Sequence, residues 1–486
     1  KNNFKDILVF SAYPSDYLIH LSMAIILSNR GHKVTVLIKI NSDDEMNKER
    51  KTKTKYEEYF GEIKPELLKY GIRIFFTNDL LYKETVLSSS VINKIERQSI
   101  EDSQRILKNP EFKISNRIHK NIFNYRLKEN TKFAKNFMNF TKEKKFNNYI
   151  IHSGSWAEYG IAFKILKKLK KNIICFGYRN DKNTIVISYN KQFNELDLNN
   201  AWKRKNKKLS NTEQRISNFL THSFTKKEYY KKRVYLNFHT EDPLNKEKLI
   251  KKLKLKKKFG NILILTSLSF DTTVLTKKTN HIFESQFQWL KETINFLEKE
   301  NYNIIVRPHP AENLTNCKMT CEKFLKKEIK NISNNIIILP SNTDINTYGL
   351  IDIVDFGIVY SSDIGWEMIL RKKPVIACGK GVAWGKGIQF EPKNLKEYYE
   401  LLKKILNKEI NFDKRKHFLL AQKFMYLYLN EVPKIFPFPL REFWSKKTFN
   451  DLQKLIKNNV HSKKYDKTFS ILSSEKKLYD GLLGKI

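Results

Sequence analysis

The stretch RPHPAE at residues 307–312 places a guanidinium, an imidazole and a carboxylate directly after a short apolar run. A residue that precedes proline avoids the helical region, so the two prolines hold Arg307 and His309 extended, with little freedom to lose on binding. The planar fork of arginine suits a phosphate, and a histidine can donate to a phosphate or ribose oxygen. The same stretch could equally end a strand and reverse the chain. The residues alone leave both interpretations open.

A second stretch, YSSDIGWE at residues 360–367, combines hydroxyls, a glycine and a carboxylate. Ser361 and Ser362 stand between an expected strand and an expected helix, where backbone N–H groups and hydroxyls can bind a phosphate. Gly365 allows close approach of a ligand or of another backbone segment, and Glu367 can accept hydrogen bonds from ribose hydroxyls. The alternative is an ordinary capped helix with a charged surface residue.

A third stretch, CGKGVAWGKGIQFEP at residues 378–392, is rich in glycine and contains Lys380 and Lys386. Flexible backbone beside a ligand would explain the glycines, and the two lysines could face a phosphate. Ordinary turns explain the glycines as well.

The elements around these stretches predict where they meet. Short apolar strands alternate with helices after residue 260, which predicts a parallel sheet covered on both faces. Ligands of such sheets bind outside the carboxyl ends of the strands, where all three stretches fall. This arrangement favours a nucleotide mono- or diphosphate. A P-loop and a GxGxxG turn after the first strand are both missing from the sequence, which argues against kinase-like and dinucleotide-binding interpretations. The expected strands are 261–267, 303–306, 335–340, 355–360 and 374–378.

The first half of the chain predicts a second α/β domain. Strand 6–12, helix 15–31 and strand 32–40 form a β-α-β unit with short joints. Residues 41–147 are rich in lysine and follow a mostly helical pattern, which indicates a helical insertion. The lysine-rich run at 244–260 is interpreted as a linker. The predicted organisation is an N-terminal domain (1–243, insertion at about 41–147), the linker (244–260), a C-terminal domain (261–415) and a helical segment packing across both domains (416–486).

Charge and composition limit the class of protein. The 486 residues carry a formal net charge of +40, which fits nucleic acid, an anionic membrane surface or acidic substrates, although a bias towards Lys, Asn and Ile explains part of it. Four scattered cysteines predict neither a zinc site nor disulfides, and indicate a reduced, cytoplasmic setting. We expect no membrane span and no signal peptide, because no apolar run approaches about 20 residues.

The order RPHPAE, YGLIDIVDFGIVYSSDIGWEMILRKKPVIACG and WGKGIQFEP closely resembles the C-terminal half of bacterial capsule and surface-polysaccharide glycosyltransferases. These are GT-B enzymes related to the Kdo-transferase and polysialyltransferase groups. The resemblance covers roughly residues 260–410, and the opening HLSMAIILSNRGHKVTVL is similar to the first β-α-β of many GT-B proteins in a less specific way. The segment AWKRKNKKLSNTEQRI (201–216) looks like one that precedes the linker in capsule proteins, and 41–147 has no counterpart.

The resemblance implies two Rossmann-like parallel-sheet domains that face each other across a cleft, with the nucleotide-sugar donor held by the C-terminal domain. In place of the Ser-Thr of many relatives this chain has Ser-Ser-Asp-Ile-Gly-Trp-Glu, and Asp363 beside an anionic donor is unfavourable unless it points away as a helix cap. The donor-binding residues that the resemblance implies are Arg307, His309, Glu312, Ser361, Ser362, Gly365, Glu367, Lys386 and Gly387.

The expected chemistry passes through an oxocarbenium-like state, and the leaving nucleotide gains negative charge. GT-B proteins commonly need no metal, so we expect no metal and no cofactor, and helix N–H groups with Arg307, His309 and Lys386 would stabilise that charge. A base from the N-terminal domain would activate the acceptor hydroxyl. Asp16 and His20 could form a dyad on one helix face, although the pattern favours a half-buried structural role for His20. The candidate bases are Asp16, His20, His152 and Glu158.

The predicted function is transfer of a sugar from a CMP- or UDP/CDP-type donor to a cell-surface polysaccharide or lipid-linked glycan. A teichoic-acid-type polyol-phosphate transferase with a CDP-alcohol donor is the alternative. A non-catalytic nucleic-acid-binding protein ranks lower, because the lysines are spread along the chain and no RNA-binding motif is present. We expect a cytoplasmic protein that can lie on the anionic inner face of the membrane. The basic segment SKKTFNDLQKLIKNNVHSKKY could be a surface helix or a solvated packing helix.

Overall fold

The computed structural model divides the chain into two compact units. Unit 1 comprises Lys1–Asp102, Lys120–Ala201 and Glu431–Ile486, and unit 2 comprises Ser103–His119 and Trp202–Asn430. The predicted linker at 244–260 therefore falls inside unit 2, and the predicted C-terminal segment is shared between the units. The residues that the structure describes are 4–39, 60–61, 63–77, 80, 85–179, 184–196, 198, 202–203, 245–275, 282–329, 331–428, 432, 434–436, 446–459 and 462–474.

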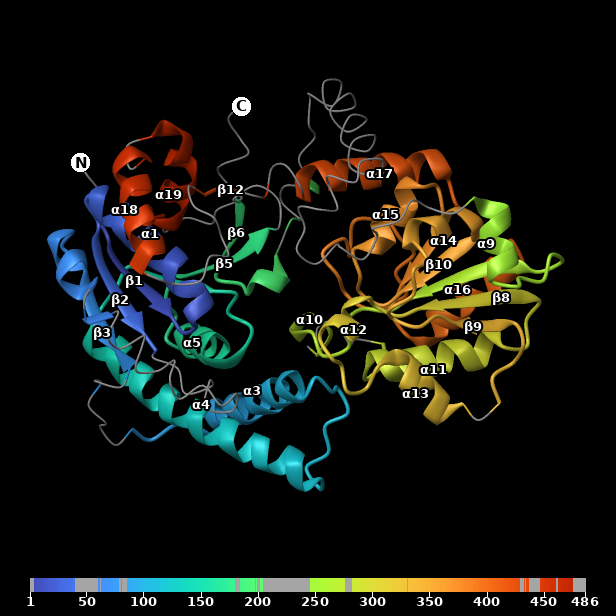
Figure 1. Cartoon of the computed structure of the whole chain (residues 1–486), viewed down its shortest axis with the longest axis horizontal. Helices are drawn as coiled ribbons and strands as arrows, with labels where there is room; N and C mark the ends of the chain where they lie inside the picture. The colour runs from blue at the N-terminus through green and yellow to red at the C-terminus, as the bar shows by residue number, and fades with distance from the viewer. Residues whose placement is uncertain are drawn as a thin grey trace. The chain divides into compact units, whose positions relative to one another are not determined.

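Unit 1 contains a sheet with strand order β12-β6-β5-β4-β1-β2-β3 (Figure 1). Its centre is parallel, whereas β6 and β12 add antiparallel strands at one end. Strand β3 lies inside the range expected to be a helical insertion, and neither it nor β6 was predicted. The strands are β1 (Asp6–Ser11), β2 (Lys33–Ile38), β3 (Arg73–Phe76), β4 (Asn148–His152), β5 (Ile173–Arg179), β6 (Thr184–Tyr189) and β12 (Lys434–Ile435).

Helices cover both faces of this sheet, because successive side chains of a strand point to opposite faces. Ile7 and Val9 of β1 join one core with α1, α18 and α19, whereas Leu8 and Phe10 join another core with α4 and α5. Figure 1 shows α1, α18 and α19 grouped on one side of the sheet. The helices are α1 (Pro14–Asn29), α3 (Ser89–Leu107), α4 (Arg117–Glu143), α5 (Ala157–Lys168), η3 (Phe193–Glu195), α18 (Lys446–Asn459), η5 (Lys463–Tyr465) and α19 (Asp466–Leu472).

The basic segment with two open interpretations forms α18, and two of its apolar side chains pack inside unit 1. Phe449 is 3% exposed and Leu452 is 2% exposed, and both belong to the core that α1 shares. This favours the packing helix over a helix whose apolar face lies in a membrane surface. Within the described ranges, no helix combines the length and the apolar character that a membrane span requires.

Unit 2 contains a wholly parallel sheet with strand order β11-β10-β7-β8-β9. The strands are β7 (Gly260–Leu265), β8 (Tyr302–Arg307), β9 (Ile336–Ile338), β10 (Phe356–Val359) and β11 (Val375–Ala377). The alternating helices are α9 (Lys246–Lys252), α10 (Thr272–Leu275), α11 (Gln286–Leu297), α12 (Ala311–Leu314), α13 (Cys321–Glu328), α14 (Thr347–Ile353), α15 (Ile364–Leu370), α16 (Leu395–Leu406) and α17 (Lys414–Tyr426).

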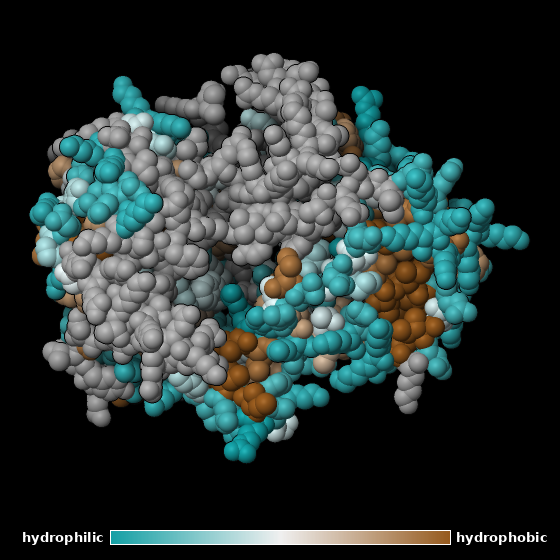
Figure 2. Space-filling model, in the orientation of Figure 1, coloured by the Kyte–Doolittle hydropathy of each residue, from teal (hydrophilic) through white to brown (hydrophobic). Residues whose placement is uncertain are grey.

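The predicted fold class, two α/β parts built on parallel sheets, is confirmed. The apolar strand runs of unit 2 are buried, as expected for strands covered on both faces: Ile262, Ile264 and Ile304 are each 0% exposed. Hydrophilic residues dominate the described surface in Figure 2, with apolar residues gathered in limited patches.

Candidate functional site

Three neighbouring strand ends of unit 2 bring hydroxyls and an imidazole together. Thr266 and Ser267 follow β7, His309 follows β8, and Ser361 follows β10. Thr266 Oγ1 accepts the backbone N–H of His309 at 3.1 Å, and Ser267 Oγ lies 3.5 Å from Ser361 Oγ. These four residues are called the strand-end cluster below. Thr266 and Ser267 are not among the residues predicted from the sequence, although the hydroxyl-rich LTSLSF directly follows an apolar strand and could have indicated them.

His309 is held as a neutral hydrogen-bond donor. Its Nδ1 accepts the backbone N–H of Ala311 at 3.1 Å, so the proton of the neutral ring is on Nε2. Burial lowers the pKa of His309 to about 4, with the nearby Asp271 acting in the opposite direction and Arg307 in the same direction as burial. Near neutral pH the ring can therefore donate to a phosphate oxygen without carrying a charge.

Arg307 braces backbone at the sheet edge. It is 2% exposed, and its Nη1 donates to the carbonyls of Pro308 at 3.3 Å, Pro340 at 3.4 Å and Ser341 at 3.3 Å. Burial lowers its pKa to about 10. The geometry gives Arg307 the task of positioning the loop after β9, and its predicted contact with a phosphate stays a prediction.

Glu312 is fully buried in α12, where its carboxylate contacts the start of α13. It accepts the backbone N–H of Cys321 at 3.1 Å and lies 3.1 Å from the Cys321 thiol. Burial raises the pKa of Glu312 to about 7. The structure thus gives this side chain a helix-capping contact, which differs from the donor contact that the resemblance implied.

The second predicted stretch forms the start of α15. Ser362 accepts the backbone N–H of Gly365 at 3.2 Å through its carbonyl. A Cβ at Gly365 would lie 2.3 Å from Gln389 Nε2 and 2.9 Å from Val359 Cγ2, so a larger residue here would have to displace the Gln389 side chain. Glu367 accepts the Tyr348 hydroxyl at 2.7 Å, which fixes the carboxylate that we expect to meet a ribose.

Asp363 does not cap α15. It occupies the N-cap position without a side-chain capping bond, and it accepts the Tyr428 hydroxyl at 3.3 Å instead. The side chain therefore does not take the capping role that would turn it away from a donor, and it contacts Tyr428.

The glycine-rich stretch passes beside the strand-end cluster. A Cβ at Gly381 would lie 2.8 Å from the Ser361 carbonyl oxygen, so only glycine allows this approach. Lys380 is exposed, whereas Lys386 is 6% exposed and donates to the Trp384 carbonyl at 3.0 Å. Gly387 adopts φ +67°, a conformation that favours glycine. The predicted phosphate contacts of this stretch stay predictions.

Unit 1 brings two of the four candidate bases together. His152 ends β4 and Asp16 lies in the first turn of α1, and β1 and β4 are parallel neighbours. His152 Nδ1 lies 3.1 Å from Asp16 Oδ2, which also accepts the Tyr159 hydroxyl at 3.0 Å. The two groups lie within ion-pair distance, although Nδ1 and Oδ2 are not aligned as a hydrogen bond.

His20 does not form the expected side-chain dyad with Asp16. It is 0% exposed, and its Nδ1 lies 2.9 Å from Ser11 Oγ and 2.8 Å from the backbone carbonyl of Asp16. Burial lowers the pKa of His20 to about 4. The predicted structural role of this histidine agrees with these contacts, and His152 replaces it as the imidazole beside the Asp16 carboxylate.

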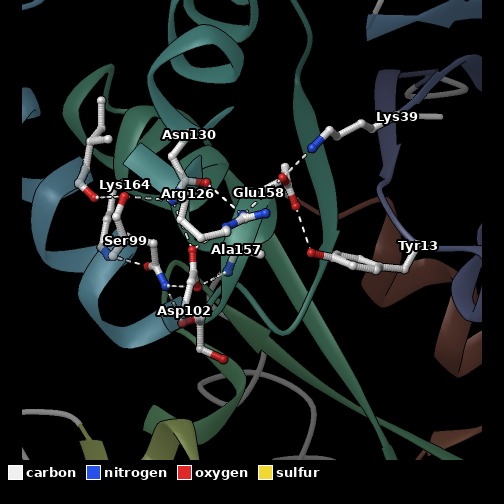
Figure 3. A network of polar contacts seen from close by, with 12 residues as sticks. Tyr13, Lys39, Ser99, Asp102, Arg126, Asn130, Ala157, Glu158 and Lys164 are labelled. Carbon is white, nitrogen blue, oxygen red and sulfur yellow. Dashed lines mark hydrogen bonds and ion pairs between the residues drawn. The ribbon is translucent and has the colours of Figure 1, made fainter. Parts of the chain in front are cut away.

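Glu158 is a buried, ion-paired carboxylate (Figure 3). It contacts Lys39 Nζ, accepts Arg126 Nη2 at 3.2 Å and accepts the Tyr13 hydroxyl at 2.8 Å. Burial alone would raise its pKa, but Lys39 and Arg126 outweigh burial and hold the pKa of Glu158 well below its usual range. A carboxylate in this environment is a poor base, because it holds its negative charge against protonation.

A second carboxylate, Asp102 of α3, completes this network. Arg126 Nη2 lies 3.5 Å from Asp102 and donates to Asn130 at 2.9 Å. Asp102 also accepts the Asn130 amide at 3.0 Å and the backbone N–H of Ala157 at 2.8 Å. The network therefore ties α3 and α4 to the first turn of α5, directly after His152 and its loop.

Across the described part of the chain, no three or more His, Cys, Asp or Glu side chains gather in a way that could hold a metal ion. The expectation of a metal-independent reaction stays a prediction.

Residues 189–409 match the family described as capsule polysaccharide biosynthesis protein. The predicted resemblance to capsule-synthesis proteins is confirmed. The matched segment contains the whole strand-end cluster and every predicted donor-binding residue. The predicted enzyme class, a glycosyltransferase of the GT-B kind, agrees with this match and with the two parallel-sheet units.

Solved structures similar to the chain include two Kdo transferases of KpsC from Thermosulfurimonas dismutans. The β-Kdo 2,7 transferase shows 14% identity and a TM-score of 0.36, covering 66% of this chain and 89% of that one. The β-Kdo 2,4 transferase shows 12% identity and a TM-score of 0.38, covering 64% and 87%. Arabidopsis thaliana UGT89C1 complexed with UDP shows 10% identity and a TM-score of 0.29, covering 93% and 99%. No curated protein matches the chain.

Proposed function

We propose that the protein transfers a sugar from a CMP- or UDP/CDP-type nucleotide-sugar donor to a cell-surface polysaccharide or lipid-linked glycan, without a metal. The observation that carries this proposal is the strand-end cluster, which lies at the carboxyl edge of a parallel sheet inside the segment that matches the capsule-synthesis family. Ligands of such sheets bind at this edge.

The strand-end cluster supplies neutral donors for the phosphate groups. The Nε2 proton of His309 and the hydroxyls of Ser267 and Ser361 would stabilise the charge that the leaving nucleotide gains. Arg307 acts one step away, because it braces the loop at Pro340 and Ser341. The Glu367 carboxylate, oriented by Tyr348, would accept the ribose hydroxyls.

The reaction has three linked changes. The acceptor oxygen bonds to the anomeric carbon, the bond from that carbon to the phosphate oxygen breaks with its electron pair staying on the nucleotide, and the acceptor proton passes to a base. We assign the base to His152, because its Nδ1 lies 3.1 Å from the Asp16 carboxylate and the ring can then take a proton at Nε2. Glu158 is excluded from this role by its two cationic partners.

The net charge of +40 favours an acidic acceptor or an acceptor at the anionic inner face of the membrane. Each basic residue near such a surface adds about 1 kcal/mol of attraction. Phe449 and Leu452 of α18 are buried in unit 1, so these two side chains would not contribute to such a contact.

Thermal unfolding of the whole chain with CMP, CDP, UDP and GDP tests the donor proposal. A nucleotide that binds only the folded protein stabilises it by about 2.7 kcal/mol at about 100 times its dissociation constant. We expect at least one nucleotide to raise the melting temperature, and we expect His309→Ala to remove that rise. His32→Ala, the same substitution in unit 1, is the matched control and should keep it. The proposal fails if none of the four nucleotides stabilises the protein, and the donor-site assignment fails if His309→Ala responds like His32→Ala.

A further inference from the structure

Two aromatic residues stand where helix caps are expected. Tyr13 precedes α1 and Trp156 precedes α5, and both have the extended backbone of an N-cap residue. Ser, Thr, Asp and Asn are preferred there because their side chains accept a helix N–H. Neither Tyr13 nor Trp156 makes such a bond. Both positions therefore carry an aromatic ring and lack the stabilisation that a capping side chain would provide.

The two rings meet at the edge of the sheet. Their centroids lie 4.3 Å apart at an interplanar angle of 39°, and both residues are partly exposed to solvent. Helices α1 and α5 pack into the cores on opposite faces of the sheet. Their first residues can therefore meet only at the carboxyl edge, where substrates of parallel sheets bind.

The backbone that carries Trp156 is held in an unfavourable conformation. Ser153 and Ala157 adopt φ values of 56° and 43°, in a region that non-glycine residues rarely occupy. Asp102 accepts the Ala157 N–H at 2.8 Å, and Gln192 donates to the Gly154 carbonyl at 2.7 Å. The surrounding contacts thus enforce the position of Trp156.

The Tyr13 ring is held from its polar end. Its hydroxyl donates to the Glu158 carboxylate at 2.8 Å, and Lys39 and Arg126 donate to the same carboxylate (Figure 3). The buried charge network therefore positions an aromatic side chain instead of supplying a catalytic base. An aromatic ring with a fixed polar end is a common element of binding sites, because the ring loses little freedom when a ligand arrives.

The aromatic pair adjoins the proposed base. The centroids of His152 and Trp156 are 6.4 Å apart, and His152 lies beside Asp16. We propose that Tyr13 and Trp156 form a stacking surface for a pyranose ring of the acceptor glycan, next to the ring whose hydroxyl meets His152. This inference rests on the proposed function. It states that unit 1 binds the acceptor and that the acceptor contains a pyranose ring. The apolar C–H face of a sugar ring suits an aromatic surface, and neighbouring polar groups provide the orientation.

The test is binding of the fluorescently labelled whole chain to an array of immobilised bacterial surface oligosaccharides. We expect the wild-type protein to bind at least one oligosaccharide, and Trp156→Ala to bind it about tenfold more weakly or worse. Trp156→Phe keeps a ring and should retain most of the affinity. Tyr13→Phe keeps the ring but loses the bond to Glu158, so it should bind with intermediate affinity. Tyr70→Ala, a partly buried aromatic residue at the amino end of β3, is the matched control and should bind normally.

Nucleotide stabilisation, measured on the same variants, separates this inference from the proposed function. Nucleotide stabilisation retained by Trp156→Ala, together with loss of glycan binding, supports the aromatic acceptor surface. Unchanged glycan binding by Trp156→Ala overturns it, and so does a wild-type chain that binds no oligosaccharide while responding to a nucleotide. Loss of the nucleotide response in Trp156→Ala, with Trp156→Phe and the fold intact, would also overturn it, because the ring would then serve the donor. If no nucleotide stabilises the wild-type chain, the proposed function fails, and the inference that rests on it fails as well.

Discussion

Replacing Glu158 by glutamine should destabilise unit 1 strongly. The carboxylate is 0% exposed and lies 3.2 Å from Arg126 Nη2, with Lys39 as a second cation. A single ion pair at 3.2 Å contributes about 5 kcal/mol at an effective dielectric constant of about 20. Breaking one partner of a buried pair costs about 3–5 kcal/mol in practice. We therefore expect Glu158→Gln to lower the free energy of unfolding of unit 1 by about 3–5 kcal/mol.

The assay is urea unfolding combined with hydrogen exchange of β4 and α5, which reports on unit 1 alone. Lys39→Met in the Glu158→Gln background removes the cation left unpaired and should recover part of the loss. Glu66→Gln is the control, because it breaks an exposed pair with Lys69 and should cost under about 1 kcal/mol.

Acidification gives a second check on Glu158. Its folded pKa lies below the ordinary value, so its contribution is present above the unfolded pKa and is lost as the pH falls towards the folded pKa. The penalty of Glu158→Gln should therefore shrink in acid. A penalty under about 1 kcal/mol at neutral pH, or no recovery with Lys39→Met, would show that the ion pairs of Glu158 do not stabilise unit 1.

Three further outcomes follow from unit 2. The pKa of Glu312 is raised to about 7 from 4.5, so the free energy of unfolding of the wild type should fall by about 3 kcal/mol as the pH rises through that window. Glu312→Gln should not show this fall. An equal fall in the wild type and in Glu312→Gln would contradict this. Gly365→Ala should weaken nucleotide stabilisation and lower the melting temperature, because the new Cβ would displace the Gln389 side chain and press on Val359; a melting curve and a nucleotide response equal to those of the wild type would contradict this. Arg307→Lys should weaken binding of a nucleotide more than binding of inorganic pyrophosphate, because it loosens the loop after β9 without removing a phosphate ligand; an equal loss for both would make Arg307 a phosphate ligand after all.

The sequence predicted the sheet of unit 2 well, because its strands are continuous apolar runs separated by helices. It also placed His309 and Ser361 at one edge, because the carboxyl ends of parallel strands lie at the same edge of a sheet. Strand β3 was missed because a four-residue strand at the rim of a sheet carries little periodicity. The six-residue antiparallel strand β6, which lies between β5 and β12, was also missed, although TIVISY is a mostly apolar run.

The tasks of individual side chains were harder to predict than their location. Arg307 and Glu312 have the residue types of ligands, and their predicted donor contacts stay predictions. The structure adds contacts that the sequence does not show: Arg307 donates to a backbone carbonyl, and Glu312 accepts a backbone N–H at the start of α13. The Asp16–His152 pair joins residues far apart in the chain, and no local pattern shows such a contact. The helical spacing that suggested an Asp16–His20 dyad gave the right proximity, but the contact goes to the backbone of Asp16.

Calorimetric titration with the nucleotide that stabilises the protein most tests whether the strand-end cluster binds the donor. The wild type, His309→Ala and His32→Ala are titrated in parallel. We expect one binding site, a loss of about tenfold or more in affinity for His309→Ala, and wild-type affinity for His32→Ala. Equal affinities for the wild type and His309→Ala would contradict the proposal that the strand-end cluster binds the donor.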